Sequence, residues 1–356
     1  MLSVLPTALR TAALTLSMAA LCGLSGCASV RYLGQAAHGQ WQLMRARRPI
    51  TQLIADPRTE PTLRDRLELV QEARDFAVRE LGLPDNRSYR TYADLKRPYV
   101  VWNVVAAPEF SVAPLRWCFP FTGCIAYRGY FHEQAAQAFA GQLARAGNDT
   151  LVAGVTAYST LGHFADPVLN TMMRYGDLDL IATMFHELAH QLVYVRGDSE
   201  FNESFAMAVE QEGLARWLNA RSRSSELAGY LLRRQQQQTI VATFARGRSQ
   251  LDQLYRQPLP PAERRAAKQT QLASIGREVK QLEAQYQVHT GYDAWIDAGL
   301  NNAHLASVAT YFDCIPSFER LLAQQYGSLP QFYAAVRQLA RAKPAQRREF
   351  CSLPPQ

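Results

Sequence analysis

The sequence has few cysteines, no Cys-x-x-Cys pair, no long run of basic residues, and an N-terminal apolar run that is short. Lys and Arg outnumber Asp and Glu by 38 to 31, but they are scattered and no nucleic-acid-binding motif accompanies them. Nucleic acid is therefore not an expected partner. Without a Cys-x-x-Cys pair, a metal site built from cysteines is disfavoured. The N-terminal apolar run is too short for a membrane span, and its C-terminal flank is wrong for one.

The first 26 residues are organised like a secretory signal, with Arg10 near the start, an apolar run and then small residues. The segment Leu24–Cys27, "LSGC", resembles the bacterial lipobox. The resemblance implies cleavage before Cys27 and lipid attached to it, and acyl chains anchor a protein by about 0.8 kcal/mol per buried CH₂. The residue after the cysteine, Ala28, is not acidic. By resemblance to lipoprotein sorting signals, this implies that the protein is located at the outer membrane of the bacterial cell envelope, facing the periplasm. The alternative is a soluble periplasmic protein in which a cysteine follows the signal by chance.

The chain that follows the signal has 330 residues, with 37 basic and 31 acidic side chains once Arg10 is removed. This length suits one large domain or two smaller ones. The segment "RARRPI" (Arg45–Ile50) lies close to the expected anchor. It could contact anionic lipid, although the effect is only about 1 kcal/mol per charge.

Four cysteines remain when Cys22 leaves with the signal and Cys27 carries lipid. Four cysteines allow three pairings. The first two of them flank "FPFTG", whose Pro and Gly favour a turn, so a local bridge is the simplest choice. The expected disulfides are Cys118–Cys124 and Cys314–Cys351.

Hydrophobic periodicity predicts an α+β fold that is mostly helical. Apolar spacing near 3.6 residues favours helices over about 30–83, and segments rich in Val, Ile, Tyr and Trp favour strands from Tyr99 onward. We expect a small mixed sheet beside the helix at 178–195, and a long helical hairpin interrupted by Pro258–Pro261. The hairpin is also a candidate surface for a protein partner. The expected parts are a signal at 1–26, N-terminal helices and strands at 27–150, a metal core at 151–220, the hairpin at 221–290 and a C-terminal helical part at 291–356.

The segment "FHELAHQ" contains an HExxH motif on a predicted helix. His186 and His190 are one turn apart and differ by about 40° around the axis, so both imidazoles can meet one cation. Zinc suits nitrogen ligands and, in catalytic sites, keeps a position open for water. Glu187 can reach such a water without being a ligand, and can take its proton. The alternative is an amphipathic helix with two core histidines.

The segment "NESFAMAVE", whose first glutamate lies thirteen residues after His190, resembles the N-E-G-F-A-x-x-x-E segment of zinc aminopeptidases in the thermolysin-like superfamily, the gluzincins. The resemblance implies a zincin-like core in which Glu203 is the third zinc ligand. It also implies that Glu210 supports a ligand histidine, because a carboxylate bonded to a metal-bound histidine fixes its tautomer. Asn202 matches the motif as well. Seven residues are two helical turns, so both glutamates face the same side.

Two features depart from the gluzincin pattern. Only twelve residues separate His190 from Glu203, so the connection must be tight, and "RGDS" supplies a turn. The expected edge strand Leu151–Ser159 holds "GVTAYS" where the aminopeptidases carry a glutamate that grips the substrate amine. That strand should pair with an extended substrate through its backbone. The acids that could replace the missing glutamate are Asp166, Asp177, Asp198 and Glu200.

The chain as a whole is similar to a family of bacterial zinc aminopeptidase lipoproteins, through "YSTLGHFADPVLNTMM", "FHELAHQ", "FNESFA" and "YRGYF". The resemblance runs from near Arg31 to about residue 340. Peptide hydrolysis also needs a donor for the oxyanion. Tyr158, Tyr311 and His304 are candidates, and Tyr311 is favoured because gluzincins take this donor from a later helix.

The leading interpretation is a zinc-dependent peptidase, acting on periplasmic peptides as an aminopeptidase, with Glu187 as general base. One alternative is a zinc endopeptidase that cuts periplasmic proteins or cell-wall peptides. Another is a non-catalytic scaffold lipoprotein that keeps the metal for stability. An intact Glu187 argues against the scaffold, because a purely structural site has no use for that acid.

Overall fold

The computed structural model describes residues 31–119, 123–157, 159–308 and 314–352. The chain divides into two compact units, one ending at Ala46 and the other spanning Arg47–Gln356. The described part of the first unit is a single helix over residues 31–45. None of the described helices combines the length and apolar character needed to cross a membrane.

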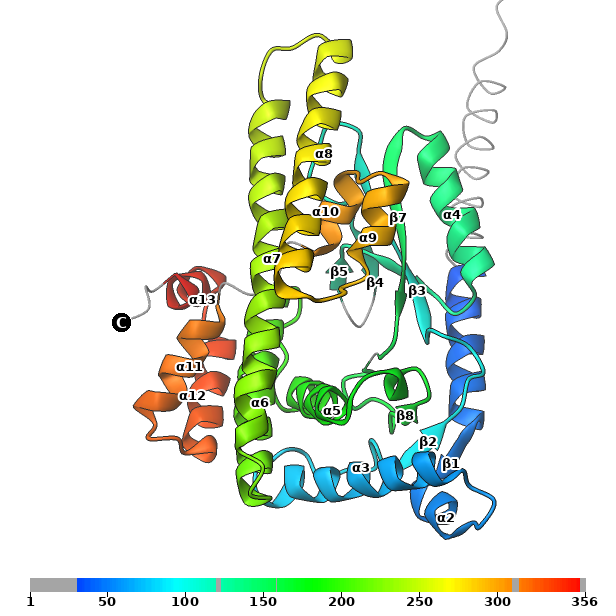
Figure 1. The fold of residues 1–356 in the computed structure, drawn as a ribbon, viewed down its shortest axis with the longest axis vertical. Coiled ribbons are helices and arrows are strands. Elements are labelled where there is room, and N and C mark those ends of the chain that lie inside the picture. The colour runs from blue at the N-terminus through cyan, green and yellow to red at the C-terminus, as the bar shows by residue number, and fades with distance from the viewer. Residues whose placement is uncertain (1–30, 120–122, 158, 309–313, 353–356) are drawn as a thin grey trace, which may run out of the picture. The chain divides into compact units, whose positions relative to one another are not determined.

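The described strands of the second unit form three separate sheets (Figure 1). A mixed sheet has the order β1-β2-β8, an antiparallel sheet has the order β6-β3-β7, and β4 pairs with β5 alone. The single mixed sheet of the sequence prediction is therefore divided into three. The strands are β1 (Arg47–Pro49), β2 (Thr91–Ala93), β3 (Val101–Pro108), β4 (Trp117–Phe119), β5 (Gly123–Ile125), β6 (Arg128–Tyr130), β7 (Asn148–Val155) and β8 (Val168–Leu169).

Helices make up most of this unit, which confirms the mostly helical α+β class. The first helices are α2 (Ile50–Ala55), α3 (Pro61–Arg79), α4 (Glu133–Arg145), α5 (Asp177–Leu192) and α6 (Ser199–Ala220), with a 3-10 turn η1 (Met172–Arg174) before α5. The later ones are α7 (Ser225–Tyr255), α8 (Pro261–Tyr286), α9 (Tyr292–Ala298), α10 (Asn302–Val308), α11 (Ile315–Gln324), α12 (Leu329–Arg341) and α13 (Pro344–Cys351).

The predicted boundaries of two elements were wrong. The helix expected to continue through Arg47–Pro49 is strand β1 there, because these residues pair with β2, more than forty residues away. Strand β7 ends at Val155 rather than Ser159. It pairs only with β3 among the described strands, so it is an edge strand, as predicted. Helices α4 and α10 both pack against β3 and β7.

Helix α6 lies between α5 and the C-terminal helix α11 and is buried over most of its length (Figure 1). It packs along α5, which presents Phe185 and Leu188 as fully buried side chains. On another side, Phe201 and Phe205 of α6 contact Phe318 of α11, with ring centroids 5.1 and 5.9 Å apart. Helix α6 is therefore packed between α5 on one side and α11 on another.

Both predicted disulfides are present. Cys118–Cys124 joins directly opposed residues of β4 and β5, and Cys314–Cys351 ties the end of α13 to the residue before α11. Arg196, in the loop between α5 and α6, donates from Nη2 to the backbone oxygen of Phe119 at 3.3 Å. The β4–β5 hairpin is thereby attached to the connection between these two helices.

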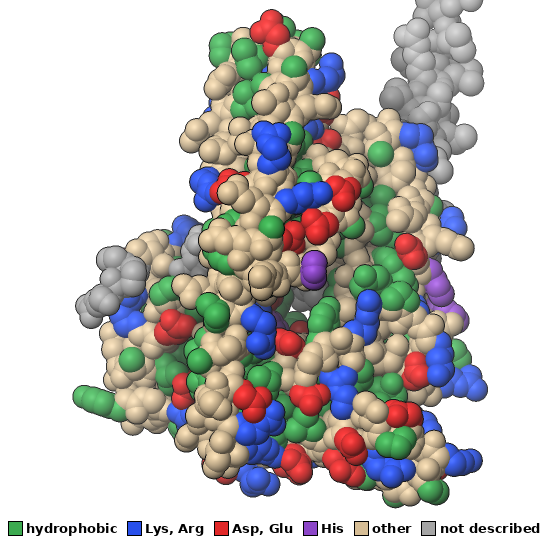
Figure 2. All heavy atoms as spheres, viewed as in Figure 1, with side chains coloured by type: hydrophobic (Ala, Val, Ile, Leu, Met, Phe, Trp, Pro, Cys, Tyr) green, Lys and Arg blue, Asp and Glu red, His purple; other side chains and the backbone are tan. Residues whose placement is uncertain are grey.

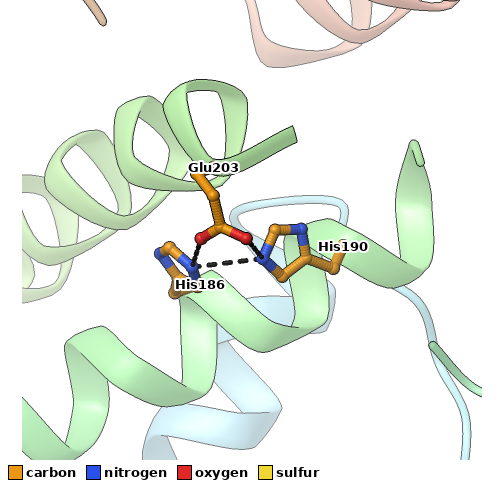
Figure 3. Close-up of side chains that lie close together, drawn as sticks. All are labelled: His186, His190 and Glu203. Carbon is orange, nitrogen blue, oxygen red and sulfur yellow. Dashed lines mark hydrogen bonds and ion pairs between the residues drawn. The ribbon is translucent and has the colours of Figure 1, made fainter. Parts of the chain in front are cut away.

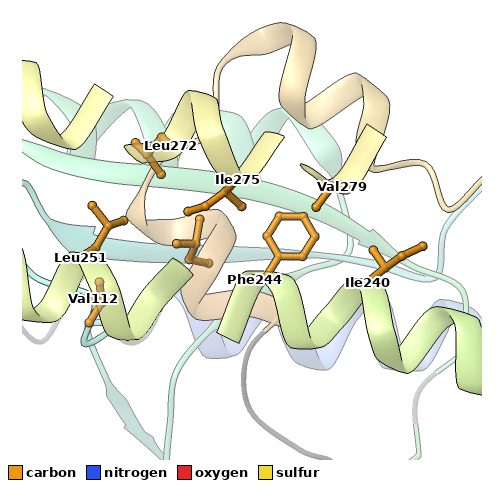
Figure 4. Close-up of a cluster of buried hydrophobic side chains, with 8 residues drawn as sticks. Val112, Ile240, Phe244, Leu251, Leu272, Ile275 and Val279 are labelled. Atoms are coloured by element: carbon orange, nitrogen blue, oxygen red, sulfur yellow. The ribbon is translucent and has the colours of Figure 1, made fainter. Parts of the chain in front are cut away.

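The hairpin expected around Pro258–Pro261 consists of α7 and α8, which lie side by side over most of their length (Figure 1). Its apolar seam also receives side chains from outside the hairpin (Figure 4). The buried residues of the seam are Val112, Ile240, Phe244, Leu251, Leu272, Ile275, Val279 and Leu305.

Gly247→Ala is expected to destabilise the protein by about 1–3 kcal/mol, the usual cost of overpacking a core. A Cβ at Gly247 would lie 2.3 Å from Cδ1 and 2.6 Å from Cγ1 of Ile275 across the seam. Gly229→Ala is the matched control on the same helix, because Gly229 is exposed and its nearest neighbour, Arg233 Nη1, is 3.7 Å away. The control should stabilise by up to about 1 kcal/mol through helix propensity. Thermal unfolding measures both changes, and equal melting temperatures would contradict the close contact.

Lys and Arg side chains lie among Asp and Glu side chains over the face shown in Figure 2. The charges of the described residues are mixed on this face, and no basic stripe crosses it. This distribution agrees with the scattered basic residues of the sequence.

Candidate metal centre

Helices α5 and α6 carry the motif residues and are joined by a short, well-bonded loop. The side chain of Asn202 accepts a hydrogen bond from the Val195 backbone N–H at 2.7 Å and donates one to its carbonyl oxygen at 2.8 Å. Gly197 adopts a φ of +79°, a left-handed conformation that suits glycine. Asp198 caps α6 by accepting from the Phe201 backbone N–H. The hydrogen bonds of Asn202 therefore stabilise the short loop between α5 and α6, which the short spacing between the HExxH motif and Glu203 requires.

His186, His190 and Glu203 point toward one another (Figure 3). The two Nε2 atoms of His186 and His190 are 3.2 Å apart. Glu203 Oε2 lies 3.3 Å from His186 Nε2, and Glu203 Oε1 lies 3.6 Å from His190 Nε2. Ligand atoms 2.0–2.2 Å from a tetrahedral zinc ion are about 3.3–3.6 Å apart. The two nitrogens and one carboxylate are thus spaced as three ligands of such an ion would be, and their donor types fit zinc.

Hydrogen bonds and charge link these groups. Burial opposes the charged form of His186, but hydrogen bonds to Glu203 and Glu210 raise its pKa to about 10. Burial alone would raise the pKa of Glu203, yet the hydrogen bonds to His186 and His190 hold it well below its usual range. A metal at His186 Nε2 therefore has to displace a proton, and metal affinity should rise with pH.

Glu210 lies behind His186, two turns after Glu203 on α6. Its Oε2 accepts a hydrogen bond from His186 Nδ1 at 3.0 Å. This contact is the one that the gluzincin resemblance implied. Burial works to raise the pKa of Glu210, but the hydrogen bond from His186 and the charge of Arg234 lower it. Tyr230 and Arg234 also contact Glu210, and neither residue was predicted from the sequence.

Glu187 is half-buried beside the three converging side chains and has no hydrogen bond to a described residue. Burial raises its pKa; the charges of His186 and His190 act in the opposite direction, and those of Glu203 and Asp166 add to the rise. A carboxylate with a raised pKa and no hydrogen bond to the described residues is suited to accept a proton at neutral pH.

A family model described as "Putative aminopeptidase" matches residues 31–351, which is most of the chain. The chain belongs to this family. No curated protein and no solved structure matches it. The family supports a hydrolase of the peptidase class, and the match extends slightly beyond the segment expected from the sequence motifs.

Two of the acids considered for amine recognition are engaged elsewhere. Asp166 is buried. One of its carboxylate oxygens accepts a hydrogen bond from the Thr160 hydroxyl at 2.8 Å, and the other accepts one from the Thr160 backbone N–H at 2.9 Å. Asp177 begins α5 and pairs with Arg66 Nε at 3.0 Å. Both therefore have structural partners in the described part of the chain.

The other two acids lie at the start of α6. Asp198 caps this helix and binds Arg347 Nε at 2.7 Å. Glu200 lines a surface pocket together with Asp198, Arg347 and Arg348. These contacts connect α6 to the C-terminal helix α13.

The oxyanion candidates Tyr158 and Tyr311 lie outside the described residues, as does the lipidation candidate Cys27. His304 is described, and its Nδ1 lies 2.9 Å from Asn301 Oδ1 at the start of α10. Its ring packs on Trp295, and burial lowers the pKa of His304 to about 4. His304 is therefore neutral near pH 7 and belongs to the packing of α10.

Proposed function

We propose that this protein is a zinc-dependent peptidase with a zincin-like catalytic core, acting as an aminopeptidase. The observation that supports it best is the spacing of His186, His190 and Glu203, at 3.2 to 3.6 Å between their donor atoms. Two imidazoles and one carboxylate are a ligand set of catalytic zinc sites, which keep one position for water. Membership of the aminopeptidase family supports the same reaction class.

Bound zinc would supply a Lewis acid that activates water and polarises the scissile carbonyl. His186 and His190 would hold it through Nε2, and Glu203 through a carboxylate oxygen. Glu210 orients His186 by accepting from Nδ1. Glu187 accepts the proton of the attacking water and passes it to the leaving amine, a role suited to its raised pKa and its lack of a described hydrogen-bond partner. We keep Tyr311 as the proposed oxyanion donor.

We further propose that the peptide substrate binds along the edge of β7 that pairs with no described strand. Edge strands bind extended peptides through main-chain hydrogen bonds, which are indifferent to side chains. Thr156, directly after β7, accepts a hydrogen bond from Thr171 and contacts the hydroxyl of Tyr175 at 3.3 Å, shortly before α5. The edge of β7 thus leads toward the helix that carries His186.

A pair of matched peptides, one with a free N-terminus and one acetylated, tests the aminopeptidase specificity. Acetylation removes the charge that an amine-binding acid would recognise, so we expect the free peptide to be cleaved from its N-terminus and the acetylated one to resist cleavage. Mass spectrometry of the products measures both. Equal cleavage of the two peptides would reject the aminopeptidase specificity.

A zinc endopeptidase is the second candidate, and a specific observation favours it. Strand β7 has no acid at the position of the family's amine-binding glutamate, and Asp166 and Asp177 already have partners. If no acid meets the amine, internal bonds of periplasmic proteins or cell-wall peptides become the substrate. A non-catalytic scaffold is disfavoured because a purely structural metal site has no use for Glu187, which makes no hydrogen bond to a described residue.

We also propose a lipid anchor at Cys27 that holds the protein at the outer membrane, facing the periplasm. The two disulfides support an oxidising compartment, since such bonds persist in the bacterial periplasm. Metabolic labelling with a fatty acid, with Cys27→Ser as the control, would test this anchor.

A further inference from the structure

The carboxylate of Glu210 is held from two directions. One oxygen, Oε2, accepts from His186 Nδ1 at 3.0 Å. The other, Oε1, accepts from the hydroxyl of Tyr230 at 2.6 Å and lies 3.1 Å from Arg234 Nη2. Glu210 is 5% exposed and Tyr230 is 2% exposed, so these contacts are shielded from water.

Tyr230 and Arg234 both belong to α7, the first helix of the hairpin. They are four residues apart and therefore lie on one face of that helix, one turn from each other. Further along the hairpin, Lys268 of α8 donates to Asp149 Oδ2 at 2.6 Å and to the backbone oxygen of Glu109 at 2.9 Å. The hairpin is thus attached both to the antiparallel sheet and to the side chain behind His186.

A buried carboxylate is unfavourable unless charge or hydrogen bonds compensate it. Arg234 supplies the opposite charge, and Tyr230 supplies a short hydrogen bond to the oxygen that His186 does not use. Glu210 Oε2 therefore remains available to His186. When His186 Nδ1 carries the proton of that hydrogen bond, Nε2 presents its lone pair toward His190 and Glu203.

We propose that Tyr230 and Arg234 are positioning residues of the metal centre, which hold Glu210 so that His186 keeps the orientation and tautomer that bind the ion. The inference rests on the proposed function, because it assumes that the ion binds at His186, His190 and Glu203. It assigns the hairpin a role in the site itself, in addition to any partner surface on its exposed faces.

Zinc affinity of the purified full chain, measured by competition with a chromophoric chelator, tests the proposal. Tyr230→Phe and Arg234→Met should each weaken zinc binding by about three- to tenfold, somewhat less than the 10–100-fold typical for direct hydrogen-bond partners of a ligand histidine. The absorption spectrum of the Co²⁺-loaded protein should shift as well. Arg233→Met is the matched control, because Arg233 is exposed and adjacent on α7, and it should leave affinity and spectrum unchanged.

A double-mutant comparison separates positioning from general stability. If Tyr230 acts through Glu210, adding Tyr230→Phe to Glu210→Gln should cause no further loss of zinc affinity. Independent losses in that background, or variants that bind zinc as tightly as the unmodified chain, would overturn the inference and leave the proposed function intact. If the unmodified chain binds no zinc, the proposed function fails and the inference fails with it.

Discussion

Glu187→Gln is expected to lower peptide hydrolysis by about 10²- to 10⁴-fold, the usual contribution of a general base. The amide keeps the size of the side chain but cannot accept the proton of the attacking water. Because Glu187 makes no hydrogen bond to a described residue, its replacement should leave the fold and zinc binding unchanged. Steady-state kinetics on a cleaved peptide, with zinc content measured on the same sample, gives both results.

Glu212→Gln is a suitable control for this experiment. Glu212 lies on α6, the helix that carries Glu203, but it pairs with Arg216 at 2.7 Å near the surface. Its replacement should leave activity close to that of the unmodified protein. Full activity of Glu187→Gln would show that Glu187 is not the base, whether or not zinc is bound.

Glu203→Ala is expected to weaken zinc binding by more than about 100-fold, because it would remove a proposed ligand, whereas changes to a ligand's partners already cost 10–100-fold. His186 and His190 would remain with their Nε2 atoms facing each other, but without the carboxylate that spans them. Chelator competition measures the affinity, and peptide hydrolysis should fall in parallel. Unchanged zinc affinity would show that Glu203 is not a ligand and would reject the gluzincin arrangement.

The HExxH motif and the gluzincin resemblance predicted the central residues of the candidate site, and helical spacing placed them on common faces. His186 and His190 are one turn apart, and Glu203 and Glu210 two turns apart, so each pair shares a face as soon as the helix forms. The structure brings the first three together and places Glu210 against His186. Local chemistry likewise predicted the Cys118–Cys124 bridge, since the Pro and Gly of the intervening "FPFTG" favour a turn.

Contacts between segments far apart in the sequence determined the features that the sequence did not predict. Tyr230 and Arg234 lie 20 and 24 residues beyond Glu210 on a different helix, and nothing in their spacing indicates which carboxylate they will meet. Strand β1 likewise forms only because β2 pairs with it. The sequence left Asp166 as a candidate for binding a substrate amine, but Thr160 donates hydrogen bonds to both carboxylate oxygens of Asp166. Which residues share one face of a helix can therefore be predicted from the sequence, whereas the partners of a buried charge depend on how separate helices and loops pack.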